Sequence, residues 1–102
     1  ILGGVCHGPL GFLKAKSVTG EPLVKGRRIT AVTDKQVRDL RITSTPHHPE
    51  TELRRLEADF RCVHRFRDAF ANWWEVDDNI VTGQNQNAAP MVAREIMQLI
   101  SK

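Results

Sequence analysis

Short apolar runs alternate with turn residues along the first third of the chain. Residues 1–5 place Ile, Leu and Val around two glycines, which predicts a short buried strand, and residues 28–33 alternate as a second strand would. Between them, Pro9 opens a predicted helix over 9–16, because its fixed φ suits a first helical turn, and 17–25 is a loop punctuated by Gly and Pro. This order predicts a βαβ unit with a right-handed crossover and two parallel, paired strands.

Helical spacing of apolar residues dominates the middle of the chain. A helical turn is predicted over 34–40, and a helix that begins at Pro49 places Leu53, Leu56 and Phe60 on one face. We expect this face to pack against a sheet.

The last third of the chain predicts a hairpin and a helix. Strands over 73–76 and 79–82 flank a two-residue turn, Asp77-Asp78, and Asp78 is expected in the left-handed region of φ. The final helix covers 88–100. Its buried stripe is formed by Ala88, Val92, Ile96 and Leu99.

The most reactive stretch lies at the end of the first strand, where Gly4 and Gly8 flank Cys6 in the pattern small-x-nucleophile-x-small. That is the pattern of a nucleophile elbow, a sharp strand-to-helix turn that presents one reactive side chain. The nucleophile is strained there, and the residues two before and two after it come so close that only small ones fit. The pattern predicts Cys6 as a nucleophile and Gly4 and Gly8 as the elbow backbone. The alternative is a small buried cysteine between a strand and a helix.

A nucleophilic cysteine must reach the thiolate form. A free thiol has a pKa of about 8.5, and the N–H groups of a following helix would lower it. His7 is placed to act as the acid/base, and the backbone N–H groups of Cys6, His7 and Gly8 are placed to hold an oxyanion. This chemistry requires no metal or organic cofactor.

Three separated stretches resemble the ThiJ/PfpI superfamily of class I glutamine amidotransferase-like proteins. They are VCHGP at 5–9, the stretch 19–34 with TGEPLVKG and ITAVTD, and NIVTGQN at 79–85. The similarity covers nearly the whole chain and is nearest to the branch that contains heat-shock-type members with glyoxalase III activity. It implies an α/β fold, a flavodoxin-like three-layer sandwich, with residues 1–102 in a single domain.

The same resemblance raises further expectations. In that family the elbow lies near the middle of the domain, so a chain that begins at Ile1 on the elbow strand is expected to be a truncated, carboxy-terminal half; the alternative is a small protein of the same design. The acid that completes the Cys-His pair is expected before Ile1, and Asp34 is the nearest candidate within the chain. Glu57 stands where a glycine commonly closes a helix, so we expect it in a left-handed conformation that costs about 1 kcal/mol.

Composition and charge narrow the range of partners. Hydrophobic residues make up 40% and charged residues 26% of the chain, as in a soluble globular protein, and no apolar run reaches the roughly 20 residues of a membrane helix. The net charge of +3 is scattered, without the basic stripe of a nucleic-acid site. Two cysteines make no disulfide framework, and a reducing, cytoplasmic setting suits a nucleophilic thiol. We expect neither nucleic acid nor a membrane as partner, and the resemblance implies a homodimer.

The remaining reactive side chains are interpreted as structural. His47 and His48 invite a metal, but adjacent histidines point in different directions and no third ligand stands at a suitable spacing. Cys62, within a strand predicted over 60–64, lacks a frame of small residues and is assigned to the core. In the resembling family the arginines of 65–67 would lie in a loop near the active site; surface charge is the simpler interpretation.

Three functional interpretations stay open. The first is an enzyme in which Cys6 attacks the carbonyl carbon of an α-oxoaldehyde and His7 shuttles protons. The resemblance implies glyoxalase III-type conversion of methylglyoxal to lactate, or a related hydrolase or deglycase activity. The second is a non-catalytic stress protein, either a redox sensor or a holding chaperone. The third is a fragment that is inactive alone, because an incomplete sheet exposes an edge that aggregates or pairs.

Overall fold

A computed structural model describes residues 1–42, 47–63 and 72–101. In chain order, its elements are β1 (Leu2–Val5), the 3-10 helix η1 (Gly8–Phe12), β2 (Arg28–Ile29), α1 (Asp34–Asp39), α2 (Pro49–Arg55), β3 (Asp59–Phe60), β4 (Trp74–Asp77), β5 (Ile80–Gly83), the 3-10 helix η2 (Gln86–Ala88) and α3 (Ala89–Ile100).

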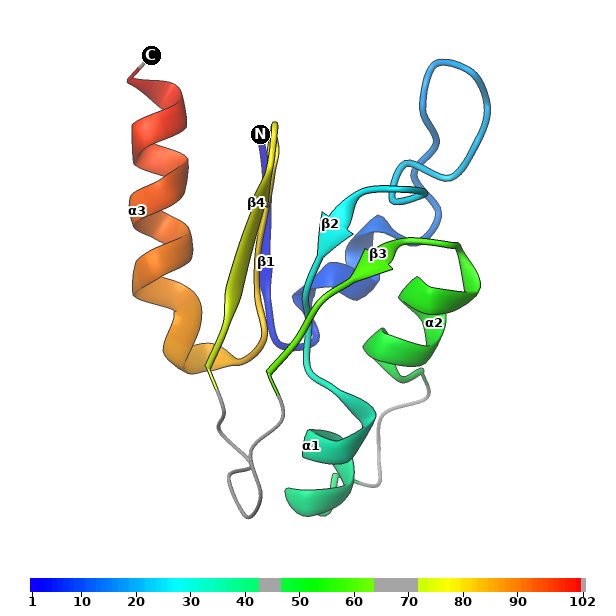
Figure 1. Cartoon of the computed structure of the whole chain (residues 1–102), viewed down its shortest axis with the longest axis vertical. Helices are drawn as coiled ribbons and strands as arrows, with labels where there is room; N and C mark the ends of the chain where they lie inside the picture. Colours follow the sequence, from blue (N-terminus) through cyan, green and yellow to red (C-terminus); the bar gives the residue numbers. More distant parts are fainter. Residues whose placement is uncertain (43–46, 64–71, 102) are drawn as a thin grey trace.

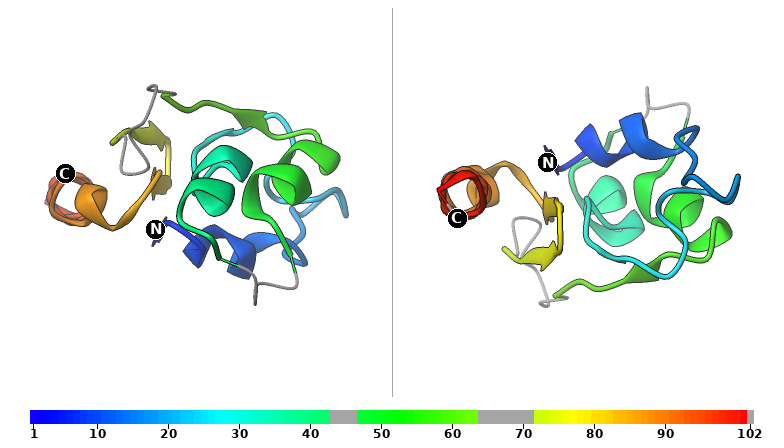
Figure 2. Two further views of the ribbon diagram at one scale, coloured as in Figure 1. Left: turned by 90° about the horizontal axis from the view of Figure 1, so that it is seen from below. Right: turned by 90° about the horizontal axis from the view of Figure 1, so that it is seen from above.

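The elements are arranged in layers, with strands between helices. Figure 1 shows α3 on one side of the strands and α1 and α2 on the other. The views from below and above agree, with α3 well separated from α1 and α2 (Figure 2). The α/β fold class expected from the sequence is confirmed. No helix within the described ranges is long and apolar enough to cross a membrane.

The strands form two small sheets rather than the expected βαβ pair. In the first sheet β5 lies between β1 and β4, parallel to β1, with Leu2 opposite Ile80, and antiparallel to β4. In the second sheet β2 is parallel to β3. The predicted pairing of 1–5 with 28–33 is therefore wrong. All four residues of β5 are buried, and a buried strand needs neighbours on both edges, so β5 takes the place beside β1.

Several elements are shorter than their sequence patterns predicted. The helix expected over 9–16 is a 3-10 helix that ends at Phe12. The strand expected over 28–33 pairs with β3 only at Arg28 and Ile29. At the next residue the backbone N–H of Thr30 donates to Oγ1 of Thr82 (2.9 Å), so it takes no part in the hydrogen bonds between β2 and β3.

The middle of the chain also departs from its predicted pattern. Phe60 lies in β3 rather than on α2, whose last residue is Arg55. Cys62 follows β3 instead of lying inside a strand, and His64, the last residue of the expected strand, is outside the described residues.

The local conformations of two turns agree with the sequence. β4 and β5 form the predicted hairpin, although its two-residue turn is Asp78-Asn79, one position later than expected. Asp78 has φ +51° and Glu57 has φ +64°, both in the left-handed region, as predicted. The carboxyl end of α2 and the hairpin are therefore both encoded by residues close to them in sequence.

One hydrophobic core lies between α2 and the strands. Its fully or nearly fully buried members are Val24, Ile29, Ala31, Leu53, Phe60 and Ile80. On the other side, α3 buries Val92, and its Ile96 side chain approaches β1 so closely that a Cβ at Gly3 would lie 2.7 Å from Cδ1 of Ile96. Of the predicted α3 stripe, Ile96 and Leu99 are only partly buried.

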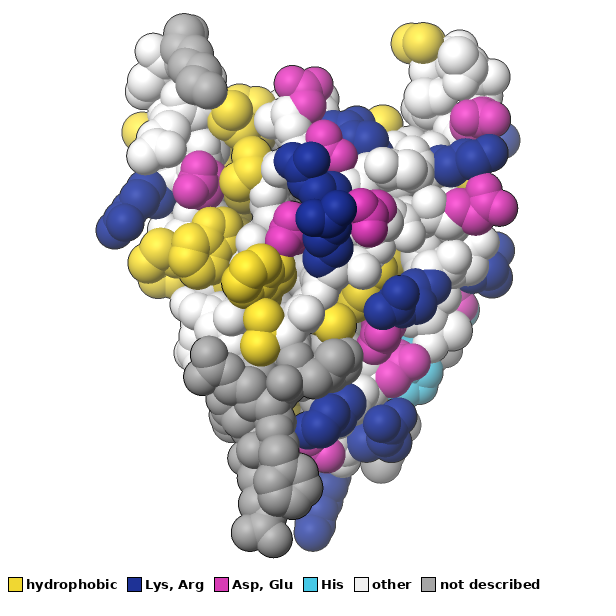
Figure 3. All heavy atoms as spheres, in the orientation of Figure 1, with side chains coloured by type: hydrophobic (Ala, Val, Ile, Leu, Met, Phe, Trp, Pro, Cys, Tyr) yellow, Lys and Arg dark blue, Asp and Glu magenta, His cyan; other side chains and the backbone are white. Residues whose placement is uncertain are grey.

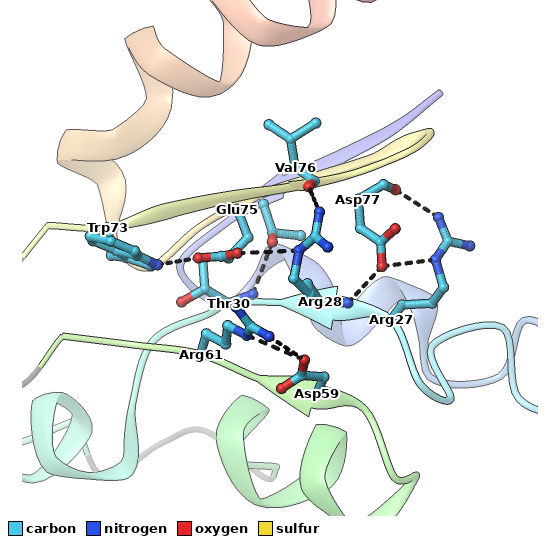
Figure 4. Close-up of polar contacts among 10 residues, drawn as sticks. Arg27, Arg28, Thr30, Asp59, Arg61, Trp73, Glu75, Val76 and Asp77 are labelled. Atoms are coloured by element: carbon cyan, nitrogen blue, oxygen red, sulfur yellow. Dashed lines mark hydrogen bonds and ion pairs between the residues drawn. The ribbon is translucent and has the colours of Figure 1, made fainter.

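Polar contacts fasten β2 to β4 across the two sheets. The side chain of Arg28 donates to the carbonyl of Val76 (2.6 Å), and the backbone N–H of Arg28 donates to the Asp77 carboxylate (2.8 Å) (Figure 4). Arg27 donates to the carbonyl of Asp77 (2.7 Å) and pairs with the carboxylate at 3.3 Å. The hydrogen bond from the Arg28 N–H, followed by the charge of Arg27, lowers the pKa of Asp77 below its usual value.

The outer surface of this region mixes charge and apolar groups. Figure 3 shows basic and acidic side chains interleaved on this face, with hydrophobic side chains gathered beside them. Trp73 and Trp74, at the start of the edge strand β4, are 41% and 38% exposed. The charge is thus distributed over this face in pairs rather than in a basic stripe.

Replacing Asp77 by Asn tests the contribution of this network. Because its pKa is lowered in the folded state, Asp77 stabilises the fold above its unfolded pKa of about 3.9, and that stability is lost as pH falls through the folded pKa. We expect Asp77→Asn to lose roughly 1–2 kcal/mol at pH 7 and clearly less at pH 2, measured by urea unfolding. The control is Asp59→Asn, which removes an exposed pair with Arg61 and should cost under about 1 kcal/mol. Equal losses at both pH values would contradict the assignment.

Candidate active site

The turn between β1 and η1 holds Cys6 in a strained backbone conformation. Cys6 has φ +59°, in the left-handed region, which costs a non-glycine residue about 1 kcal/mol or more. Two hydrogen bonds hold it there. The Cys6 N–H donates to the carbonyl of Gly83 (3.0 Å), and the Cys6 carbonyl accepts from the N–H of Val32 (3.0 Å). Segments that follow the elbow by about 26 and 77 residues therefore maintain the strain.

The two glycines of the elbow are not equivalent. A Cβ at Gly4 would lie 3.3 Å from the carbonyl carbon of Gly8 and from the ring of Pro9. A Cβ at Gly8 would meet nothing within 4 Å. The close approach expected at the elbow is present, but it restricts Gly4, and the expectation that only a small residue fits at Gly8 is wrong.

The side chains of Cys6 and His7 lie together. Sγ of Cys6 is 3.4 Å from Nδ1 of His7, within hydrogen-bonding distance for sulfur, and both residues are partly buried. Proton transfer from the thiol to the imidazole is therefore geometrically available.

The thiol does not gain the low pKa expected from a helix amino terminus. Partial burial raises the pKa of Cys6, and a hydrogen bond with the His7 backbone lowers it by less. The following helix, η1, is a 3-10 helix of five residues, so few peptide dipoles are aligned behind the sulfur. Reaching the thiolate at neutral pH therefore depends on a base, and His7 is the base in contact.

Two of the three backbone N–H groups that were expected to stabilise an oxyanion already make other hydrogen bonds. The N–H of Cys6 is already bonded to Gly83, and that of His7 bonds the Cys6 sulfur. Within the described part of the chain, the N–H of Gly8 has no acceptor. Of the three N–H groups, that of Gly8 is the one left to meet a developing negative charge.

Two buried polar atoms near this turn lack hydrogen-bond partners among the described residues. They are Nε2 of His7 and Oδ1 of Asp34. The bond from Val32 to Cys6 brings the segment that leads to Asp34 alongside the elbow. The other carboxylate oxygen of Asp34 accepts from Oγ1 of Thr51 (2.8 Å), which holds the side chain in place. A pocket of about 240 Å³ opens beside Asp34 and is lined also by Arg38, His48 and Thr51.

The other reactive side chains lie apart from the elbow pair. His47 is 4.0 Å from Glu52, and His48 is exposed just before α2. In the described ranges, no three His, Cys, Asp or Glu side chains are grouped so as to hold a metal ion. Cys62 packs against the hydrophobic core, and burial followed by the charge of Glu50 raises its pKa, as suits a structural thiol. The arginines of 65–67 are outside the described residues.

Gln84 is a residue of the site region that sequence reasoning missed. It is fully buried directly after β5, and its side-chain amide pairs with the backbone of Val63 like a neighbouring strand. Oε1 accepts from the N–H of Val63 and Nε2 donates to its carbonyl, both at 2.8 Å, while the Gln84 N–H donates to the carbonyl of Trp73 (2.8 Å). Gly83, the preceding residue, bonds Cys6. We call the two hydrogen bonds between the Gln84 amide and the Val63 backbone the Gln84 clamp. The amide-rich stretch NIVTGQN marks this position in the sequence, but the burial of Gln84 is seen only in the structure.

The elbow glycines provide a first test. We expect Gly4→Ala to cost about 1–2 kcal/mol of unfolding free energy, because the added Cβ must displace backbone atoms of Gly8 and Pro9. Gly8→Ala is the matched control and should change stability by no more than about 0.5 kcal/mol. The measurement is urea unfolding of both variants. A larger loss at Gly8 than at Gly4 would show that the elbow is built differently.

The Gln84 clamp provides a second test. Gln84→Glu loses the Nε2 donor and buries a charge, so we expect a loss of at least about 2 kcal/mol at pH 7. When the introduced carboxyl is protonated it again offers a donor and an acceptor to Val63, so stability relative to the parent chain should recover as pH falls. Gln84→Met has neither group and serves as the control, with a deficit that does not depend on pH. A deficit of Gln84→Glu that persists at low pH would rule out the paired geometry.

Comparison with known proteins finds solved structures that share the fold of this chain. No protein-family model matches the sequence, and no curated protein matches it significantly. Solved structures do match. The protein designated APC35852 is 29% identical with a TM-score of 0.88, over 99% of this chain and 44% of that one. Glyoxalase III from Candida albicans is 28% identical with a TM-score of 0.75, over 97% of this chain and 43% of that one.

A third structure, the 24 kDa Rapid Encystment Protein of Francisella tularensis, is 21% identical with a TM-score of 0.85, over 97% of this chain and 43% of that one, and shows a likeness of fold. This chain thus spans less than half the length of each of the three. All three are ThiJ/PfpI structures, so the resemblance in the sequence is confirmed, and the chain has the α/β fold of the ThiJ/PfpI superfamily.

Proposed function

We propose that this chain carries the nucleophile of a cysteine-dependent enzyme that acts on α-oxoaldehydes, converting methylglyoxal to lactate as a glyoxalase III does. The observation that carries the proposal is the contact of Sγ of Cys6 with Nδ1 of His7, 3.4 Å apart at a strained strand-to-helix turn. The similarity to glyoxalase III from Candida albicans supports the substrate class.

The chemistry follows from the order of groups at the elbow. His7 takes the thiol proton through Nδ1, and the Cys6 sulfur attacks the aldehyde carbon to form a hemithioacetal. The N–H of Gly8 offers a donor for the oxyanion. His7 then moves the proton of the former aldehyde carbon to the neighbouring carbonyl carbon, and the hydroxyl proton of the hemithioacetal passes to the oxygen of that carbonyl, which leaves a thioester of lactate. Water hydrolyses the thioester to lactate and frees the thiol, so no metal or organic cofactor takes part.

Asp34 is proposed to orient His7. A histidine that exchanges protons through Nδ1 needs its other nitrogen held, and Nε2 of His7 is buried without a hydrogen-bond partner among the described residues. Oδ1 of Asp34 is a buried acceptor for which the described part of the chain supplies no donor either. A hydrogen bond between these two atoms would satisfy both. The acid expected before Ile1 is then not needed for this role.

The non-catalytic alternative receives less support. A redox-sensor thiol is characterised by a low pKa and good access, whereas burial raises the pKa of Cys6. A holding chaperone and an inactive fragment are outcomes of the test below. A cytoplasmic homodimer that binds neither nucleic acid nor membrane accompanies the enzyme proposal, and gel filtration tests the dimer.

The test uses the two cysteines as a matched pair. We expect Cys6→Ser to abolish formation of lactate from methylglyoxal, Cys62→Ser to keep it within about twofold, and Asp34→Asn to lower kcat at least about tenfold. The parent chain should also lose activity when iodoacetamide modifies Cys6, with sites identified by mass spectrometry. Lactate formation that survives Cys6→Ser, or is absent from the parent chain, would defeat the proposal.

A further inference from the structure

A second pocket lies between η1 and α2, away from the cysteine. Its volume is about 360 Å³, within the range of small-molecule sites, and neither Cys6, His7 nor Asp34 lines it. Its walls come from two segments: Leu10, Gly11, Leu13 and Lys14 on one side, and His47, Glu52 and Arg55 on the other. We propose that this pocket binds a small aliphatic carboxylate, independently of the function proposed for the elbow.

The wall formed by η1 and the residues after it is apolar and has room for a ligand. Leu10 and Leu13 are each partly buried, so their side chains form a floor rather than a free surface. Gly11 lies between them, and a Cβ built there would meet nothing within 4 Å. An alkyl chain can therefore lie directly against the Gly11 backbone, where burial of apolar surface favours binding.

The charged residues that line the pocket leave an excess of positive charge on the η1 side, at Lys14. Glu52 is the acidic residue of the lining, and it is engaged by Arg55, whose Nε and Nη2 donate to Oε2 at 3.1 and 2.9 Å. Lys14 is exposed, and no acidic side chain of the described residues pairs with it. Among the described residues, Lys14 is thus a cation of the lining without a paired carboxylate, and it lies beside the apolar floor.

Charge and size together select the ligand class. An ammonium beside an apolar floor complements an anion with a short alkyl chain, whereas a cation of the same length would be repelled. At roughly 30 Å³ for each water-sized group, the pocket holds a molecule of about ten heavy atoms, the size of octanoate. A partly open site of this size is expected to bind with a dissociation constant of about a millimolar.

The experiment is an NMR titration of the isotope-labelled 102-residue chain with octanoate, read at the amides of Gly11 and Lys14. Octanoate should shift these amides with saturation at about millimolar concentration, while octylamine should leave them unchanged. Lys14→Gln should weaken octanoate binding at least about fivefold, by removal of the charge. Gly11→Leu should weaken it, because Gly11 lines the pocket and a leucine adds bulk at a position with open space around it.

Two variants act as matched controls. Lys16→Gln removes another exposed lysine, two positions on, that does not line the pocket. Ala93→Leu adds the same leucine at an exposed position of α3. Both variants should bind octanoate as the parent does. Should Gly11→Leu fail to fold, as its own spectrum would reveal, the pair Lys14→Gln and Lys16→Gln decides. Equal shifts with octylamine, equal effects of the two lysine variants, or no shift at about 10 mM octanoate overturns the proposal.

Discussion

The parallel pairing of β1 with β5 is the constraint on which the rest of the structure depends. It joins the two ends of the chain, and its last hydrogen bond runs from the Cys6 N–H to the carbonyl of Gly83. Gly83 has no side chain because a Cβ there would lie 2.6 Å from Cβ of Ala88 and 2.9 Å from Cγ1 of Val5. Close packing at this single position sets the distance between the elbow, β5 and the start of α3.

The two sheets are joined by side chains rather than by a shared ladder. At one end Arg27 and Arg28 bind the backbone and carboxylate of β4, and at the other Gln84 binds the backbone of Val63. Gln84 is fully buried with its amide paired, so it satisfies backbone groups that a continuous sheet would otherwise satisfy. Since Gln84 follows Gly83 directly, the position of the elbow is linked to the core on the α2 side.

The same burial that supports the fold governs the chemistry at Cys6. A strained, partly buried thiol with a raised pKa is a poor nucleophile by itself, and it depends on the imidazole in contact with it. Nε2 of His7 and Oδ1 of Asp34 have no partner within residues 1–42, 47–63 and 72–101, which is unusual because buried polar groups are nearly always satisfied. Together these features favour a site in which a proton is passed along from the thiol, rather than a thiol that is permanently ionised.

The sequence alone determined the features that depend on neighbouring residues. The spacing of Gly4, Cys6 and Gly8 predicted the strained turn, and the two-residue hairpin turn predicted the left-handed Asp78, whereas the left-handed Glu57 was expected from the family resemblance. Dihedral preferences and helical periodicity are set within a few residues, so they can be read locally. The tertiary structure decided which strands pair, how far each extends, the raised pKa of Cys6 and the clamp at Gln84. Each of these depends on burial and on contacts between segments far apart in the chain, which no local pattern encodes.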